Sequence, residues 1–172
     1  CSSLTSIEIP NSVTSIRWYA FSGCRSLTSI IVDSNNVVYD SRNNSNAIIE
    51  TSTNTLVAGC SETVIPDNVA SIGYGAFEGC SSLTSISIPD GVTSIGDYAF
   101  YGCSGLEALD LPETVTSLGN YAFSGCTKLK DIVLPDGLTQ IGYQAFGDCA
   151  SIESVTLPEN VTDISNVFYN CN

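Results

Sequence analysis

Apolar residues recur along most of the chain at a fixed step of 23 positions, and prolines mark the register. Aliphatic residues stand six, three and one positions before the proline in most copies, as Leu83, Ile86 and Ile88 do before Pro89. The last two alternate with polar neighbours, which indicates a short strand with one buried face. The register prolines are Pro10, Pro66, Pro89, Pro112, Pro135 and Pro158. So short a unit cannot bury its apolar face alone, so the pattern predicts an array of about seven stacked repeats.

The second half of each unit carries an Ala-Phe pair, usually followed by Gly-Cys. The phenylalanines are Phe21, Phe77, Phe100, Phe123, Phe146 and Phe168. Because an aromatic ring buries a large area, we expect a spine of phenylalanines and a row of cysteines opposite the strands. The run from Gly96 to Cys103 is long enough for one short helical turn in each repeat.

The repeat is interrupted between residues 33 and 65, where the chain carries ten residues beyond one unit. Two short apolar-polar segments, NAIIET and NTLVAG, are separated by Ser-Thr, which predicts a β-hairpin projecting from the array. We therefore interpret residues 1–172 as one repeat domain with a hairpin insertion. Cys60 falls at a position that is leucine in other repeats, and so leaves the row of cysteines.

Eight cysteines would suit a disulfide framework, but their spacing indicates otherwise. Cys80, Cys103, Cys126 and Cys149 are each one repeat apart. Equivalent positions on stacked strands lie about 4.8 Å apart with parallel side chains. A disulfide needs Cβ atoms about 3.8 Å apart and suitably angled. The spacing predicts a row of buried free thiols that act as small apolar groups.

Five Lys and Arg against eighteen Asp and Glu give a net charge of −13. Nucleic acid and anionic membrane surfaces demand a basic footprint, so neither is expected as a partner. No apolar run approaches the roughly 18 residues of a membrane span, so no membrane insertion is expected. The charge either keeps a Ser/Thr-rich surface soluble or forms an acidic binding patch.

Catalytic chemistry has little support in the composition. Histidine is absent, which removes the commonest general base and zinc ligand. Acidic residues occur mostly at repeat turns, where turn formation explains them. The oxygen-rich segments DSNN and DSRNN could suit calcium, but we interpret them as loops flanking the hairpin. We expect no enzyme, no metal site and no cofactor.

The pattern LxxIxIPxxVTxIxxxAFxxC resembles the BspA-like (Treponema-type) leucine-rich repeat over nearly the whole chain. The resemblance implies a right-handed solenoid with a parallel β-sheet, in a secreted or cell-surface protein used for attachment to host matrix or other cells. It supplies no catalytic residue. Unlike ordinary leucine-rich repeats, the chain lacks the asparagine after the strand that forms an internal hydrogen-bond ladder. We read the chain as a segment of a longer array.

Outward strand positions are where leucine-rich repeats usually meet ligands, and here they diversify in the later repeats. The candidate ligand-binding residues, for a protein or glycan, are Glu107, Asp110, Lys130, Asp131, Val133 and Glu153. The alternative is neutral drift on an indifferent surface. Two other functions compete with adhesion: a structural spacer, and self-association of the array through uncapped ends, since solenoids normally need polar caps.

Overall fold

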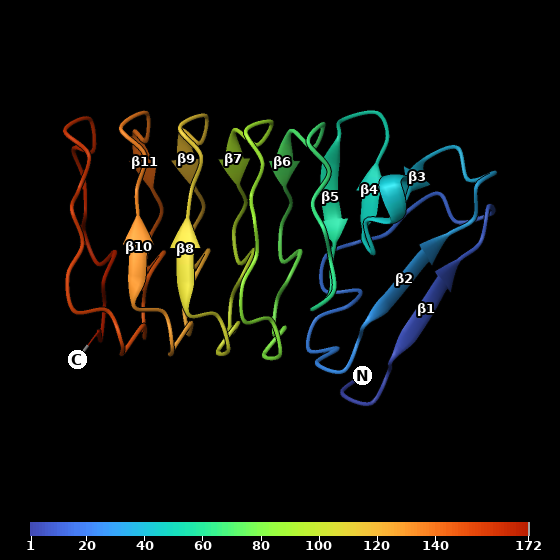
Figure 1. The fold of residues 1–172 in the computed structure, drawn as a ribbon, viewed down its shortest axis with the longest axis horizontal. Coiled ribbons are helices and arrows are strands. Elements are labelled where there is room, and N and C mark those ends of the chain that lie inside the picture. Colours follow the sequence, from blue (N-terminus) through green and yellow to red (C-terminus); the bar gives the residue numbers. More distant parts are fainter. Residues whose placement is uncertain (172) are drawn as a thin grey trace.

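The computed structural model describes residues 1–171, and the chain winds into an elongated stack of coils (Figure 1). Successive coils are joined by backbone hydrogen bonds between residues 23 apart. The amide N–H of Thr116 donates to the carbonyl of Thr93, and that of Thr139 to the carbonyl of Thr116, both at 3.0 Å. The predicted repeat solenoid is confirmed.

Strands form at the predicted place in four repeats, of which three carry the register proline. Asp131–Val133 (β10) pairs in parallel with Ala108–Asp110 (β8), and Ser6–Ile9 (β1) pairs in parallel with Ser29–Val32 (β2). Both pairs keep a register of 23 residues. The N-terminal pair is tilted away from the other coils (Figure 1). The equivalent segments before Pro89 and Pro158 do not form regular strands.

A second sheet, which the sequence analysis did not anticipate, follows the prolines. Its repeat strands come from the Val-Thr-x-Ile part of the unit and are parallel. They are Ser71–Ile72 (β6), Ser94–Ile95 (β7), Ser117–Leu118 (β9) and Gln140–Ile141 (β11). Three strands of the insertion complete the sheet, which has the order β11-β9-β7-β6-β5-β4-β3. These are Tyr39–Asp40 (β3), Ile48–Glu50 (β4) and Thr55–Ala58 (β5).

The hairpin of the insertion is part of this sheet and does not project from the solenoid as expected. Strands β4 and β5 pair antiparallel, and β5 also pairs in parallel with β6, opposite Ser71 and Ile72. Burial explains the position, because Ile48 and Ile49 are both fully buried although they point to opposite faces of β4. Ile48 packs in an N-terminal core with β1 and β2, and Ile49 packs in the main core of the later repeats. A projecting hairpin would expose one of these faces to water.

The phenylalanine spine is confirmed. Phe77, Phe100, Phe123 and Phe146 are fully buried, and their rings stack almost parallel with centroids 4.9 to 5.4 Å apart. Phe168 continues the column at 5.6 Å. The column runs through the main core and ties each coil to the next.

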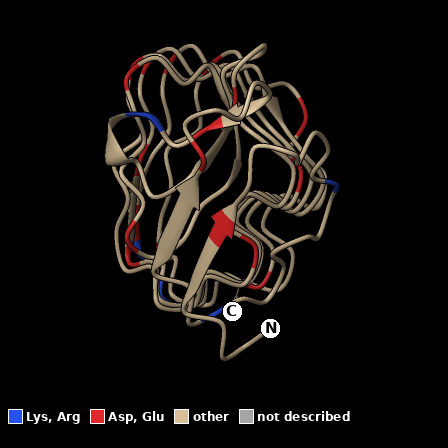
Figure 2. Cartoon of the chain, turned by 90° about the vertical axis from the view of Figure 1, so that its right-hand side faces the viewer, with Lys and Arg blue, Asp and Glu red and all other residues tan. Residues whose placement is uncertain are grey.

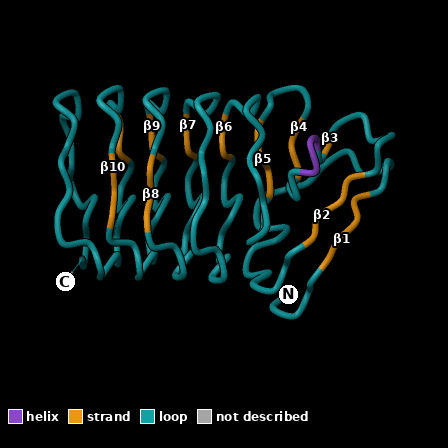
Figure 3. Tube along the Cα trace, viewed as in Figure 1, coloured by secondary structure: helices purple, strands orange, loops and turns teal. Residues whose placement is uncertain are grey.

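The short helical turns expected in the repeats do not form. The segments concerned are consecutive tight turns, and the repeats consist of strands and loops (Figure 3). Backbone conformation gives the reason. Tyr98 and Gly102 have φ angles of 59° and 69°, in the left-handed region, so a right-handed helical run cannot form between them. Within residues 1–171 the one helix is the 3₁₀-helix Arg42–Asn44 (η1) of the insertion.

Candidate functional site

The six candidate residues all lie exposed on the surface of the later coils. On β8 the side chain of Asp110 alternates with buried Leu109, and on β10 Asp131 and Val133 flank half-buried Ile132. The parallel register places Asp110 opposite Val133. The strand geometry therefore brings three of the predicted residues together on two neighbouring coils.

The other three candidates flank this pair of strands. The amide of Lys130 donates to the carbonyl of Glu107 at 3.0 Å, so these two residues occupy equivalent places on adjacent coils. Glu153 is exposed one repeat further on. Within residues 1–171 the ion pair that forms joins Arg42 and Asp40, so the charges of the candidate residues face solvent without an ionic partner.

The strand face is shallow. Asp110 lines a hollow of about 170 Å³ and Val133 lines another of about 200 Å³, each between neighbouring coils. Both hollows are too small to enclose a drug-sized ligand, and neither is lined by an aromatic side chain that could offer a flat contact surface. Asp and Glu are spread around the edges of the coils, and Lys and Arg are few (Figure 2). This surface is suited to contact with an extended partner and not to enclosing a small molecule.

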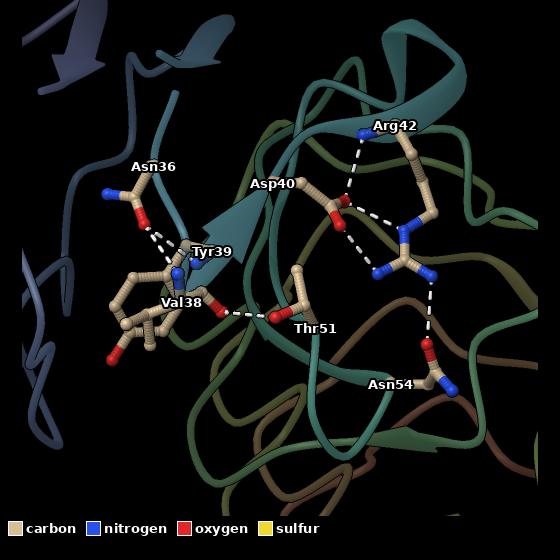
Figure 4. A network of polar contacts seen from close by, with 7 residues as sticks. All are labelled: Asn36, Val38, Tyr39, Asp40, Arg42, Thr51 and Asn54. Atoms are coloured by element: carbon tan, nitrogen blue, oxygen red, sulfur yellow. Dashed lines mark hydrogen bonds and ion pairs between the residues drawn. The ribbon is translucent and has the colours of Figure 1, made fainter. Parts of the chain in front are cut away.

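The insertion is held to the coils by side chains, of which Asn36 is the central one (Figure 4). Its Nδ2 donates to the carbonyls of Pro10 and Val13, and its Oδ1 accepts from the amides of Val38 and Tyr39, all at 2.9 Å. Sequence reasoning missed this residue. It does once, after β2, what the asparagine of ordinary leucine-rich repeats does in every copy. Its signal is an asparagine shortly after a strand that lacks the register proline.

The oxygen-rich loops make internal contacts. The Arg42 guanidinium donates to both carboxylate oxygens of Asp40, at 2.8 and 2.6 Å, and to Asn54 Oδ1 at 2.8 Å (Figure 4). The hydrogen bond to Asp40 raises the pKa of Arg42. Asp33 Oδ1 accepts from the amide and the side chain of Asn35. In the part of the chain that the structure describes, no group of three or more Cys, Asp or Glu residues could hold a metal ion.

The predicted row of free thiols is confirmed, and all eight cysteines are free. Each thiol of the later repeats donates to the carbonyl of the phenylalanine in the preceding coil, as Cys103 Sγ does to Phe77 at 3.1 Å and Cys149 Sγ to Phe123 at 3.2 Å. Burial raises the pKa of Cys149 to about 12 and that of Cys103 well above its ordinary value. Buried thiols that remain protonated are poor nucleophiles, so the row is structural.

A row of surface aromatic residues is the second feature that sequence reasoning missed. Tyr74, Tyr98 and Tyr121 follow one another on successive coils, with ring centroids 5.5 and 4.9 Å apart. Trp18 continues the row at 5.3 Å from Tyr74, and Tyr143 at 5.6 Å from Tyr121. The sequence carries a signal for this row, because an aromatic residue stands two or three positions before the phenylalanine of the Ala-Phe pair in these repeats. We call these residues the aromatic row.

Membrane insertion was not expected from the sequence. Across residues 1–171 there is no helix with the length and apolar character needed to cross a bilayer.

Comparison with family models gives one match, to the BspA type leucine-rich repeat region. Six copies are matched, over residues 1–60 and 56–172. No curated protein matches the chain.

Several solved structures are similar to the chain. A leucine rich cell surface protein from Faecalibacterium prausnitzii A2-165 is 36% identical with a TM-score of 0.86, over 98% of this chain and 46% of that one. A leucine-rich repeat protein from Bacteroides ovatus is 30% identical with a TM-score of 0.60, over 94% of this chain and 33% of that one. The T. pallidum leucine rich repeat protein is 29% identical with a TM-score of 0.55, over 90% and 53%. The chain spans about half or less of these structures.

Proposed function

Because the chain belongs to the BspA-type leucine-rich repeat family, we propose that it is a non-enzymatic binding module that meets a protein or glycan on the outward face of β8 and β10. One observation carries the proposal. Along these strands the inward position is aliphatic, buried in β8 and half-buried in β10. The outward positions are exposed and differ between coils, with Ala108 and Asp110 on one and Asp131 and Val133 on the next.

The chemistry of this face favours a partner that is extended and at least partly basic. Asp110 and Asp131 present two carboxylates without an ionic partner, and Val133, 59% exposed, adds an apolar contact between them. Charges at the rim of an interface act mainly by steering the approach of an oppositely charged partner. The F. prausnitzii relative is a cell surface protein, which supports display of this chain at the cell surface, and we propose attachment to host matrix or to another cell as the role.

The test is a binding screen of the purified chain against immobilised matrix proteins and cell-surface glycans by surface plasmon resonance. For any ligand found, the double variant Asp110→Lys/Asp131→Lys is expected to bind about tenfold more weakly at low salt, mainly through a slower association rate. The matched control is Glu62→Lys/Asp67→Lys, which makes the same charge change at exposed positions away from β8 and β10.

Three results would contradict the proposal. Equal affinities for the two double variants would place the ligand elsewhere. Failure to retain any ligand would favour a spacer that only holds another domain away from a surface. A mass that rises with concentration in sedimentation, without ligand, would favour self-association of the repeats.

A further inference from the structure

A pocket of about 180 Å³ opens between the first coil and the insertion. One wall is residues 16–22 of the first coil, and the other is formed by residues 55–58 of β5 and 73–75 after β6. Its side chains include Trp18 and Tyr19 on one side and Tyr74 on the other, with Ser22, Thr55 and Arg17 also lining it. This pocket does not include any residue of β8 or β10.

The insertion creates this pocket by replacing one rung of the sheet. Strand β5 takes the place beside β6, and antiparallel β4 follows it, so the Val-Thr-Ser-Ile segment that ends at Ile16 has no parallel neighbour. The first coil rejoins the later ones further along, where the amide of Gly23 donates to the carbonyl of Glu78 at 3.3 Å. Between these two places the walls meet through aromatic side chains, where Trp18 and Tyr19 contact Tyr74, and the pocket opens beside this contact.

The aromatic residues of the pocket hold one another in place. Trp18 stacks on Tyr74 with centroids 5.3 Å apart and an interplanar angle of 27°. Tyr19 meets the same ring edge-on at 5.4 Å, and the two tyrosine hydroxyls are hydrogen-bonded. Trp18 nevertheless remains 74% exposed and Tyr19 56% exposed. The arrangement is a fixed aromatic surface that is open to solvent.

The backbone at Tyr19 adopts the turn conformation of the repeat. Its φ angle is 64°, in the left-handed region that residues other than glycine rarely adopt. The equivalent position of the coil that contains Tyr74 is occupied by Gly75, with φ of 61°, so glycine satisfies the same turn without strain. Tyr98 and Tyr121 adopt the same conformation on later coils, with φ of 59° and 56°, so the left-handed residue belongs to the repeat turn and not to the pocket.

We propose that this pocket binds one ring of an uncharged glycan. Aromatic faces accept the apolar C–H face of a sugar ring, while Ser22 and Thr55 supply hydroxyl groups, and Gly73 and Gly75 backbone groups, for its polar edges. The charges favour an uncharged ligand: Arg17 in the lining opposes a cation, and Glu78, whose Oε2 lies beside Gly75 of the lining, opposes an anion. The volume suits a single ring and not a folded partner.

The proposed site goes beyond the strand face and is tested separately from it. Trp18 is the only tryptophan of the chain, so its emission reports on the pocket without a label. The probes are cellotetraose, N-acetylchitotetraose and lactose, titrated into the full chain. A saturable shift of tryptophan emission is expected with at least one of them, with the affinity confirmed by calorimetry.

The decisive variant is Tyr19→Gly, which removes one ring and relieves the backbone while retaining the Trp18 reporter. It is expected to weaken sugar binding at least tenfold without lowering resistance to urea. The matched control is Tyr121→Gly, at the equivalent left-handed position of another coil, with φ of 56° and outside the pocket. That control, and Glu62→Lys/Asp67→Lys, should bind the sugar as the parent chain does.

Each other result overturns the inference. Absence of any emission shift or heat with all three sugars at millimolar concentration would reject a glycan ligand. Binding of a proline-rich or lysine-rich peptide in the same pocket, without sugar binding, would reject the ligand class. Equal weakening by Tyr19→Gly and Tyr121→Gly would mean that the Tyr19 ring supports the turn and does not contact the sugar.

Discussion

Replacing Phe123 by alanine tests whether the phenylalanine column is what holds the coils together. Phe123 is fully buried, and its ring stacks on Phe100 at 5.0 Å and on Phe146 at 5.4 Å. The substitution leaves its backbone bonds in place, including the carbonyl that accepts from Cys149 Sγ. What is lost is the ring, its burial and its two stacked contacts.

The expected cost follows from these contacts. Phe→Ala in a core costs about 3–5 kcal/mol, and each aromatic pair adds about 0.5–1.5 kcal/mol beyond area burial. Two stacked partners place Phe123→Ala in the upper part of that range, about 4–5 kcal/mol. Phe168 is partly exposed and stacks on one partner, at 5.6 Å, so Phe168→Ala should cost about half as much. The stability of a solenoid is roughly a sum of repeat and neighbour contributions, so the costs of the two substitutions can be set side by side even though they lie in different coils.

The assay is urea unfolding followed by far-UV circular dichroism, with free energies taken from the midpoints at an unchanged slope. Phe123→Leu is the matched variant, because it keeps most of the apolar volume and removes the stacking, and it should cost about 1–2 kcal/mol. The reasoning is refuted if Phe168→Ala costs as much as Phe123→Ala, or if the leucine variant is as unstable as the alanine variant.

Two further predictions concern the thiols and the insertion. The folded-state pKa values of the buried thiols are raised, to about 12 for Cys80 and Cys149, above the roughly 8.5 of an unfolded chain, so stability should be level below about pH 8.5 and fall as pH rises towards 12. Urea midpoints at pH 7 and pH 10 measure this, and an unchanged midpoint at pH 10 would contradict it. Asn36→Asp turns two donors facing the carbonyls of Pro10 and Val13 into acceptors, and should cost about 3 kcal/mol. Asn68→Asp, exposed on a turn, is the control, and equal urea midpoints for the two variants would show that the Asn36 network does not hold the insertion.

The repeat allowed much of the scaffold to be predicted. The strand before the proline, the column of phenylalanines and the row of free thiols each depend on a contact between one residue and its equivalent 23 positions on. Such contacts are periodic, so the spacing of side-chain types is enough to infer them. Of the candidate site, Asp110, Asp131 and Val133 lie together on the strand face for the same reason.

The helical turns were wrongly expected because backbone dihedrals decided that detail. Length alone allowed one turn of helix between Gly96 and Cys103, but left-handed residues such as Tyr98 and Gly102 break the run. The sequence shows a tyrosine at that position and not the φ angle it adopts. Tertiary stacking of the coils overrides the local preference of tyrosine for negative φ.

By itself, then, the sequence determined the coil, its period and which residues face inward, because each of these follows from a repeating pattern of apolar side chains that must be buried. The tertiary structure alone decided what happens where the pattern stops. There the hairpin entered the sheet because Ile48 and Ile49 both had to be buried, and this removed a rung beside Ile16. Trp18 and Tyr74 hold equivalent places before Phe21 and Phe77, which the repeat shows, but 56 residues, or two periods plus ten, separate them, so only the path of the insertion decided that they touch and line one pocket.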